Sequence, residues 1–234
     1  MKALVLEEYM KLVYRDVPMP EMQDDEVLVK VKAVGICGSD VHGMDGSSGR
    51  RIPPLIMGHE ASGVIEEIGT SVKDYKTGDR VTFDSTIYRR DDWYTQKGMY
   101  NLSDGRMVLG VSTPEFKKHG AFAEYVTVPQ HILHRIPEGV NFIQAALVEP
   151  AAVSLHAINL SPIGPDDTVL VVGAGMVGMF VIQLLQIKGC KHIIAVDLEA
   201  SRLELAKKLG ADFAFVPGDP DLGKTIHSLT SNRG

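Results

Sequence analysis

The first half of the chain alternates short β-branched runs with loop residues. Residues 26–36, 78–83 and 122–129 each carry such a run, and runs of this length and composition are typical of β-strands. Apolar residues at helical spacing are scarce before Asn141. We therefore predict a β-rich structure for this part of the chain.

Strand-like and helix-like segments alternate in the last third of the chain. Residues 161–167 (SPIGPDD) precede this region and have the composition of a loop. The predicted strands are residues 168–175, 192–197 and 213–217, and the predicted helices are residues 176–189, 201–211 and 221–232. Such alternation is typical of parallel strands joined by crossover helices. We predict an α/β fold, with a β-rich domain over residues 1–155 and a doubly wound domain over residues 156–234.

Three strand–helix units make one half of a doubly wound dinucleotide-binding domain. The sequence ends at Gly234, after the third of these units. We therefore expect the chain to be a fragment of a longer protein.

Composition narrows the class of protein. The chain has 234 residues, of which 44% are hydrophobic and 23% charged, as in ordinary soluble domains. Its formal net charge of −6 argues against a nucleic-acid partner. No apolar run approaches the roughly 20 residues that span a bilayer, and the apolar start is too short for a signal peptide. Two cysteines, Cys37 and Cys190, fit a reducing compartment, so we expect a cytoplasmic protein.

A glycine-rich turn follows the first predicted strand of the second domain. Gly173, Gly175 and Gly178 have the G-x-G-x-x-G spacing of a dinucleotide-binding loop. The first glycine permits the tight turn, the second admits a pyrophosphate, and the third lets helix and strand pack closely. Met176 and Val177 open the next helix, whose N-terminus favours negative charge. The alternative is a turn of the same shape that binds no ligand.

An acidic residue ends the second predicted strand. Asp197 is placed to accept hydrogen bonds from both ribose hydroxyls and to repel a 2′-phosphate, which predicts NAD rather than NADP. Arg202, on the following helix, is predicted either to lie over the adenine or to be a solvated surface charge.

Potential metal ligands occur in three separate segments. GICGSDVHG contributes Cys37, GHEASG contributes His59 and Glu60, and ALVEPAAVSLHA contributes Glu149. A thiolate, an imidazole and a carboxylate suit a catalytic zinc, which takes three protein ligands and leaves one position open. Each of these residues taken singly has a structural interpretation, since a buried free cysteine behaves as a small hydrophobe.

These segments also carry a family resemblance. Residues 58–72 read as G-H-E-x-x-G-x5-G-x-x-V, which resembles the zinc signature of the medium-chain alcohol dehydrogenase superfamily. The companion segments, in the family's order, are GICGSDVH, GDRV, GAFAEYV, EPAAVSLHA and GAGMVG. EPAAVSLHA resembles the polyol branch, that is, sorbitol or L-iditol 2-dehydrogenases. The resemblance implies a GroES-like N-terminal catalytic domain followed by part of a Rossmann domain.

The resemblance implies roles for individual residues. Cys37 and His59 are expected to bind the catalytic zinc. In polyol-type members the glutamate matching Glu60 is a direct ligand and the one matching Glu149 holds the water at the metal. In other members the position of Glu149 supplies the ligand itself, so both glutamates stay candidates.

The resemblance also implies a route for the proton. Ser39 is expected to take the proton of the substrate hydroxyl, and His42 to pass it toward solvent through the cofactor ribose. Asp40, between them, has a structural alternative as the cap of a helix that begins there.

One region departs from the family pattern. The family has a lobe in which four cysteines bind a second, structural zinc, and the matching positions here are Arg89, Asp92, Thr95 and Ser103. Arginine cannot bind a metal, and one carboxylate with two hydroxyls does not make a tetrahedral structural zinc site. We expect a mobile, metal-free lobe over residues 86–112, with an Arg89–Asp92 ion pair replacing part of the missing zinc's role.

Together with the zinc-ligand and dinucleotide motifs, the resemblance implies a zinc-dependent, NAD-linked oxidoreductase that converts a secondary alcohol of a polyol to a ketone. It predicts one catalytic zinc, a small polyol substrate, no nucleic-acid or membrane partner, and a homo-oligomer for the full-length enzyme. The alternatives are a metal- or nucleotide-binding fragment that no longer turns over, and a threonine or 2,3-butanediol dehydrogenase. The retained Cys37, His59, Glu60 and Glu149 argue against a zinc-free quinone-reductase-like protein.

Overall fold

The structure, a computed structural model, describes residues 1–233. It divides into two compact units, Met1–Glu149 and Pro150–Gly234, with Gly234 itself outside the described residues. The predicted domain boundary at residues 155–156 lies a few residues beyond this division. No helix within residues 1–233 combines the length and the apolarity that crossing a bilayer requires.

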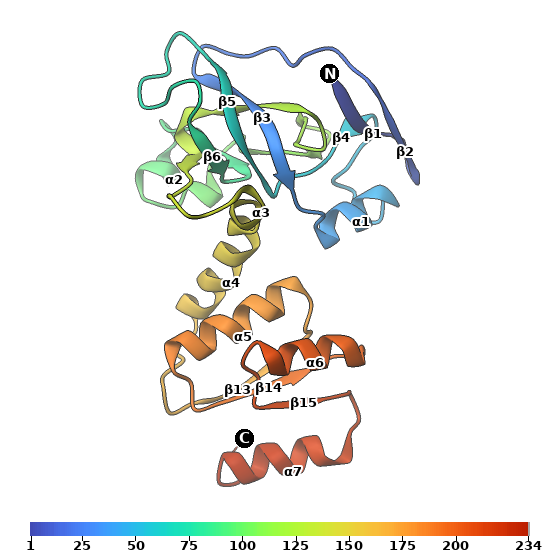
Figure 1. Cartoon of the computed structure of the whole chain (residues 1–234), viewed down its shortest axis with the longest axis vertical. Helices are drawn as coiled ribbons and strands as arrows, with labels where there is room; N and C mark the ends of the chain where they lie inside the picture. Colours follow the sequence, from blue (N-terminus) through green and yellow to red (C-terminus); the bar gives the residue numbers. More distant parts are fainter. Residues whose placement is uncertain (234) are drawn as a thin grey trace. The chain divides into compact units, whose positions relative to one another are not determined.

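Antiparallel β-sheet is the main regular structure of the first unit (Figure 1). Its main strands are β1 (Lys2–Glu8), β2 (Lys11–Asp16), β3 (Glu26–Val34), β4 (Leu55–Ile56), β5 (Ala61–Ile68), β6 (Arg80–Phe83), β11 (Tyr125–Pro129) and β12 (Leu133–Arg135). The shorter elements are α1 (Gly38–Met44), β9 (Val111–Ser112), β10 (Lys117–Lys118), η2 (Gln130–Ile132) and α3 (Phe142–Ala146). One sheet has the order β11-β3-β5-β6-β12 and another the order β2-β1-β4, which confirms the predicted β-rich part.

The pairing of β3 with β5 brings distant segments together. Val27 and Val29 of β3 and Ile65 of β5 are fully buried in one core cluster, and burying each such side chain contributes about 1.5–3 kcal/mol. The strands are antiparallel, with Val34 opposite Ala61. The residue after β3 therefore lies beside the residue before β5, and the Gly35 N–H donates to the carbonyl of Glu60 over 2.7 Å. The end of β3 and the start of β5 form one edge of the sheet.

The second unit is a parallel α/β structure. Its elements are α4 (Val148–Leu160), which begins before the division, β13 (Thr168–Val172), α5 (Met176–Lys188), β14 (His192–Val196), α6 (Ala200–Lys208), β15 (Phe213–Phe215) and α7 (Pro220–Leu229). The strands pair in parallel in the order β13-β14-β15. Figure 1 shows α5 and α6 on one side of this sheet and α7 on the other. The predicted alternation of strands and helices is confirmed.

Helix α5 covers the sheet with one apolar face. Met179, Ile182 and Leu185 follow one another at intervals of three residues and are all buried in the core of the second unit. The helix ends at Gly189, which adopts a positive φ of 80° and donates its N–H to Gln186 over 3.0 Å. Glycine adopts this left-handed conformation without the steric cost of a Cβ.

The lobe expected over residues 86–112 contains two short strands and two short helices. These are β7 (Thr86–Ile87), α2 (Trp93–Gln96), η1 (Tyr100–Leu102) and β8 (Met107–Val108), with β7 paired to β8. Asp92 is buried and caps α2: its Oδ1 accepts from the N–H groups of Tyr94 and Thr95, at 2.9 and 3.3 Å. Its Oδ2 accepts from the N–H of Asp104 at 3.3 Å. One carboxylate therefore joins both halves of the lobe.

The predicted Arg89–Asp92 ion pair is wrong. The Arg89 guanidinium pairs instead with the exposed Asp91, at 3.1 Å. Asp92 is occupied by backbone N–H groups, because a carboxylate ahead of a helix satisfies donors that the helix leaves unpaired. The Oγ of Ser103 accepts from the N–H of Arg89 at 3.1 Å, so a hydrogen bond links two of the positions that match the family's four cysteines.

We predict that Asp92→Ala loosens the lobe. Loss of a cap costs about 0.5–2 kcal/mol, and one to two kcal/mol corresponds to about a 5- to 30-fold change in an equilibrium constant. The amides of Tyr94, Thr95 and Asp104 should exchange with solvent faster by about this factor in hydrogen-exchange measurements. The matched control is Asp91→Ala, which removes only an exposed ion pair and should leave those rates unchanged. Equal rates in both variants would contradict the role of Asp92.

Candidate active site

The first part of the site is the turn into helix α1. Cys37 precedes the helix, and Asp40 is its third residue. The Oδ2 atom of Asp40 accepts from the N–H of Cys37 at 3.2 Å, which is the capping interaction considered as the alternative for this residue. Asp40 is buried, whereas Ser39 and His42 are exposed. Helical spacing of three residues places Ser39 and His42 on one face of α1.

The second part is the turn between β4 and β5, which carries His59 and Glu60. Gly58, just before them, has a positive φ of 92°, and a Cβ there would lie 2.6 Å from the ring of Phe122. Only glycine fits both the conformation and the space. Both His59 and Glu60 are buried, and the Glu60 side chain crosses above Gly35, where a Cβ would lie 2.4 Å from its Oε2.

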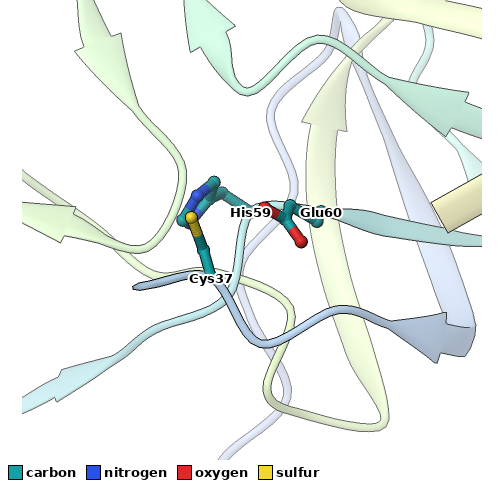
Figure 2. A group of neighbouring side chains, drawn as sticks. All are labelled: Cys37, His59 and Glu60. Atoms are coloured by element: carbon teal, nitrogen blue, oxygen red, sulfur yellow. The ribbon is translucent and has the colours of Figure 1, made fainter. Parts of the chain in front are cut away.

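Cys37, His59 and Glu60 form one cluster of potential ligand atoms. One sulfur, nitrogen or oxygen atom from each lies within 4.8 Å of the others, and Figure 2 shows the Cys37 sulfur beside the imidazole of His59 with the Glu60 carboxylate close by. Oε2 of Glu60 is buried without a hydrogen-bond partner, although buried polar atoms are normally paired. A thiol sulfur, an imidazole nitrogen and an unpaired carboxylate oxygen around one point fit a zinc ion.

The electrostatics of the cluster also favour a cation. Burial raises the pKa of the Cys37 thiol, and the Glu60 carboxylate adds to the effect, while Ser39 opposes it. Burial alone would lower the pKa of His59, but Asp40, Glu149 and Glu60 outweigh it and the pKa is raised. A cation among these groups would favour the thiolate and the neutral imidazole that metal binding requires.

Glu149 lies near the cluster but is not one of its three residues. Its Oε1 accepts a long hydrogen bond of 3.5 Å from Ser85 Oγ. Burial raises the pKa of Glu149 and Glu60 adds to this, while His59 opposes it. Of the two glutamates proposed from the sequence, Glu60 is the one grouped with Cys37 and His59.

The glycine loop of the second unit is open where a ligand would approach. A Cβ at Gly173 or Gly175 would meet nothing within 4 Å, whereas a Cβ at Gly178 would lie 1.9 Å from the carbonyl oxygen of Gly173. The third glycine is therefore required for close packing, and the first two leave the loop uncovered. Met176 and Val177 form the first turn of α5, so backbone N–H groups face outward at this helix N-terminus.

Asp197 is fixed beside this loop. Its Oδ2 accepts from the N–H of Ala174 at 2.7 Å, and its Oδ1 accepts from the N–H of Glu199 at 2.9 Å. These hydrogen bonds, that from Glu199 foremost, hold the pKa of Asp197 below its usual range. Arg202, half-exposed, lies 3.7 Å from the same carboxylate.

One residue that borders the site was missed in the sequence. Arg51 is 5% exposed, lies 3.7 Å from Asp40, and donates to Ser39 Oγ over 3.3 Å. Arg51 follows Arg50 in a polar segment whose sequence is typical of a surface loop. The one local feature that indicates a buried Arg51 is Gly43, a glycine inside a short helix.

Comparisons with known proteins show which family the chain resembles. Residues 23–138 match the alcohol dehydrogenase GroES-like domain and residues 176–234 match the zinc-binding dehydrogenase family. Sorbitol dehydrogenase of Bacillus subtilis (strain 168) is 36% identical over 100% of this chain and 66% of its own length. The chain therefore spans less than two thirds of this relative.

Two solved structures are similar over nearly the whole chain. A zinc-binding dehydrogenase from Sinorhizobium meliloti 1021, bound to NADP, is 34% identical with a TM-score of 0.85 over 97% of this chain and 64% of its own. An alcohol dehydrogenase from Escherichia coli CFT073, complexed with NADH, is 33% identical with a TM-score of 0.87 over 97% of this chain and 66% of its own. Together with the family matches, these similarities show that the chain belongs to the zinc-containing medium-chain alcohol dehydrogenase superfamily, in its polyol dehydrogenase branch.

Proposed function

We propose that the protein oxidises a secondary alcohol of a polyol to a ketone, with NAD as hydride acceptor and one zinc ion at Cys37, His59 and Glu60. The observation that carries the proposal is the buried cluster of one thiol, one imidazole and one carboxylate, whose atoms lie within 4.8 Å of one another. Such a donor set holds a zinc ion and leaves a fourth position for substrate. The similarity to sorbitol dehydrogenase supports a polyol substrate.

The reaction removes a hydride from carbon and a proton from oxygen. Cys37, His59 and Glu60 would hold a zinc ion, whose chemistry would be Lewis-acid polarisation of the alcohol oxygen, and the glycine loop would hold a nicotinamide cofactor as the hydride acceptor. Cys37 and His59 lie next to the ends of β3 and β5, and the charge of Glu149 contributes to raising the pKa of His59. The protein's contribution is placement and the exclusion of water.

Ser39 and His42 provide the route for the proton. Because Arg51 donates to Ser39 Oγ, the Ser39 hydroxyl hydrogen is left to bond elsewhere, and the oxygen retains a lone pair for an incoming proton. His42 lies one turn further along α1 and is exposed, so its imidazole can exchange the proton with solvent.

The proposal extends to the organisation of the protein. Residues 1–155 would be the GroES-like catalytic domain, with a metal-free lobe at residues 86–112, and residues 156–234 the first half of a Rossmann domain. We also propose that the full-length enzyme is a homo-oligomer and that it is cytoplasmic. The cytoplasmic location is supported by the two cysteines, which are both free thiols.

The direct test is NADH formation over a panel of polyols. We expect NADH from at least one polyol, loss of this activity when a chelator removes zinc, and recovery when zinc is returned. His59→Ala should lose both zinc and activity, because it removes one of three ligands. Retention of zinc and of polyol oxidation by His59→Ala, or no NADH from any secondary alcohol with the full-length protein, would contradict the proposal.

Cofactor choice gives a second prediction. Asp197→Asn removes a charge that accepts hydrogen bonds from the ribose, and hydrogen bonds to charged groups are worth about 1.5–3 kcal/mol. We expect NAD affinity, measured by titration calorimetry, to fall about 10- to 100-fold. The ratio of the NADP dissociation constant to the NAD dissociation constant should decrease. Glu204→Gln, on the exposed side of α6, is the control and should change neither. Equal affinity of the unmodified protein for NAD and NADP would show that Asp197 does not select the cofactor.

A further inference from the structure

A buried arginine stands behind the metal-binding cluster. We propose that Arg51 is a positioning residue of this centre: its guanidinium is the fixed counter-ion of Asp40, and through Asp40 it orients Cys37 and His59. The proposal rests on the zinc site proposed above. Arg51 is not itself a ligand or a group that touches substrate.

The environment of Arg51 requires an anionic partner. The side chain is 5% exposed, and a guanidinium stays charged in proteins. Among residues 1–233, Asp40 is the carboxylate within ion-pair distance, with Nη2 and Oδ1 separated by 3.7 Å. Burial of an unpaired charge is strongly unfavourable. The two side chains therefore constrain each other.

The backbone around Arg51 is held in place by hydrogen bonds to the segment around Ser112. Arg51 forms an isolated parallel bridge with Ser112. The N–H of Ile52 donates to the carbonyl of Ser112, and the N–H of Ser112 donates to the carbonyl of Arg50, each over 3.3 Å. The position of the guanidinium is thus set by a segment distant in sequence from the metal-binding turn.

Helix α1 makes room for the arginine. A Cβ added to Gly43 would lie 2.2 Å from Cγ of Arg51. Gly43 is in the helix and does not have a positive φ, so its backbone would accept alanine. Glycine is disfavoured inside a helix. Glycine is present here because the aliphatic part of the Arg51 side chain packs directly against the helix at this position.

Asp40 transmits this constraint to two of the three ligands. Its Oδ2 accepts from the N–H of Cys37, and its Oδ1 lies 3.5 Å from Nδ1 of His59. With Nδ1 turned toward Asp40, Nε2 is the nitrogen left to bind a metal. Carboxylates that orient a metal-binding histidine in this way tune metal affinity, and their loss typically costs 10- to 100-fold.

The test compares Arg51→Met with Arg50→Met, the same substitution at the neighbouring, exposed arginine. Zinc affinity is measured by competition with a chromophoric chelator, and the absorption spectrum of the Co²⁺-loaded protein reports ligand geometry. We expect Arg51→Met to lose zinc affinity about 10- to 100-fold and to alter the Co²⁺ spectrum. Arg50→Met should match the unmodified protein. Circular dichroism of the metal-free proteins checks that both variants fold.

A double-mutant cycle separates positioning from general stability. If Arg51 acts through Asp40, Arg51→Met should cost little further zinc affinity in an Asp40→Asn background. Fully additive losses would overturn the proposal, as would an Arg51→Met affinity within about twofold of Arg50→Met. If Arg51→Met does not fold, Arg51→Gln, which also removes the charge, is compared with Arg50→Gln, and equal zinc affinities overturn it. An unmodified protein that binds no zinc contradicts the proposed function and this proposal with it, whereas equal binding by all variants contradicts this proposal alone.

Discussion

The carboxylate of Asp40 makes the interactions on which the candidate metal-binding segment around Cys37 and His59 depends. It caps the helix that begins after Cys37, faces the imidazole of His59, and is paired on its other side with Arg51. Sheet pairing between β3 and β5 brings these turns to one edge. The fold therefore sets where the two turns with the candidate ligands meet, and we propose that Asp40 sets how their side chains are directed.

The cluster and the lobe illustrate two ways of satisfying buried polar atoms. At the cluster, Oε2 of Glu60 is buried without a hydrogen-bond partner, and a bound ion would supply one. In the lobe, the carboxylate of Asp92 accepts hydrogen bonds from three backbone N–H groups, so both of its oxygens have partners. Thr95 Oγ1 in the lobe is also buried without a partner, so the contrast between the two places is between the carboxylates of Glu60 and Asp92.

The elements of the second unit were predictable from the sequence, because β-branched apolar runs predict strands and glycines mark the turns that follow them. The candidate ligands were named from their residue types in three separate segments and from the resemblance to the family's zinc signature. Arg51 was not, because its role depends on a bridge to Ser112 that no local pattern encodes. Similarly, the adjacent Asp91 and Asp92 look equivalent in sequence. Only the start of α2 at Trp93 makes one a cap and the other a surface charge.

The central claim is that one zinc ion binds at Cys37, His59 and Glu60. The most direct measurement is an anomalous difference map from crystals of the zinc-loaded protein, collected at the zinc absorption edge. The account predicts one peak per chain, bonded to the Cys37 sulfur, a His59 ring nitrogen and the Glu60 carboxylate. A peak among residues 86–112, or a cluster peak bonded to Glu149 in place of Glu60, would contradict it.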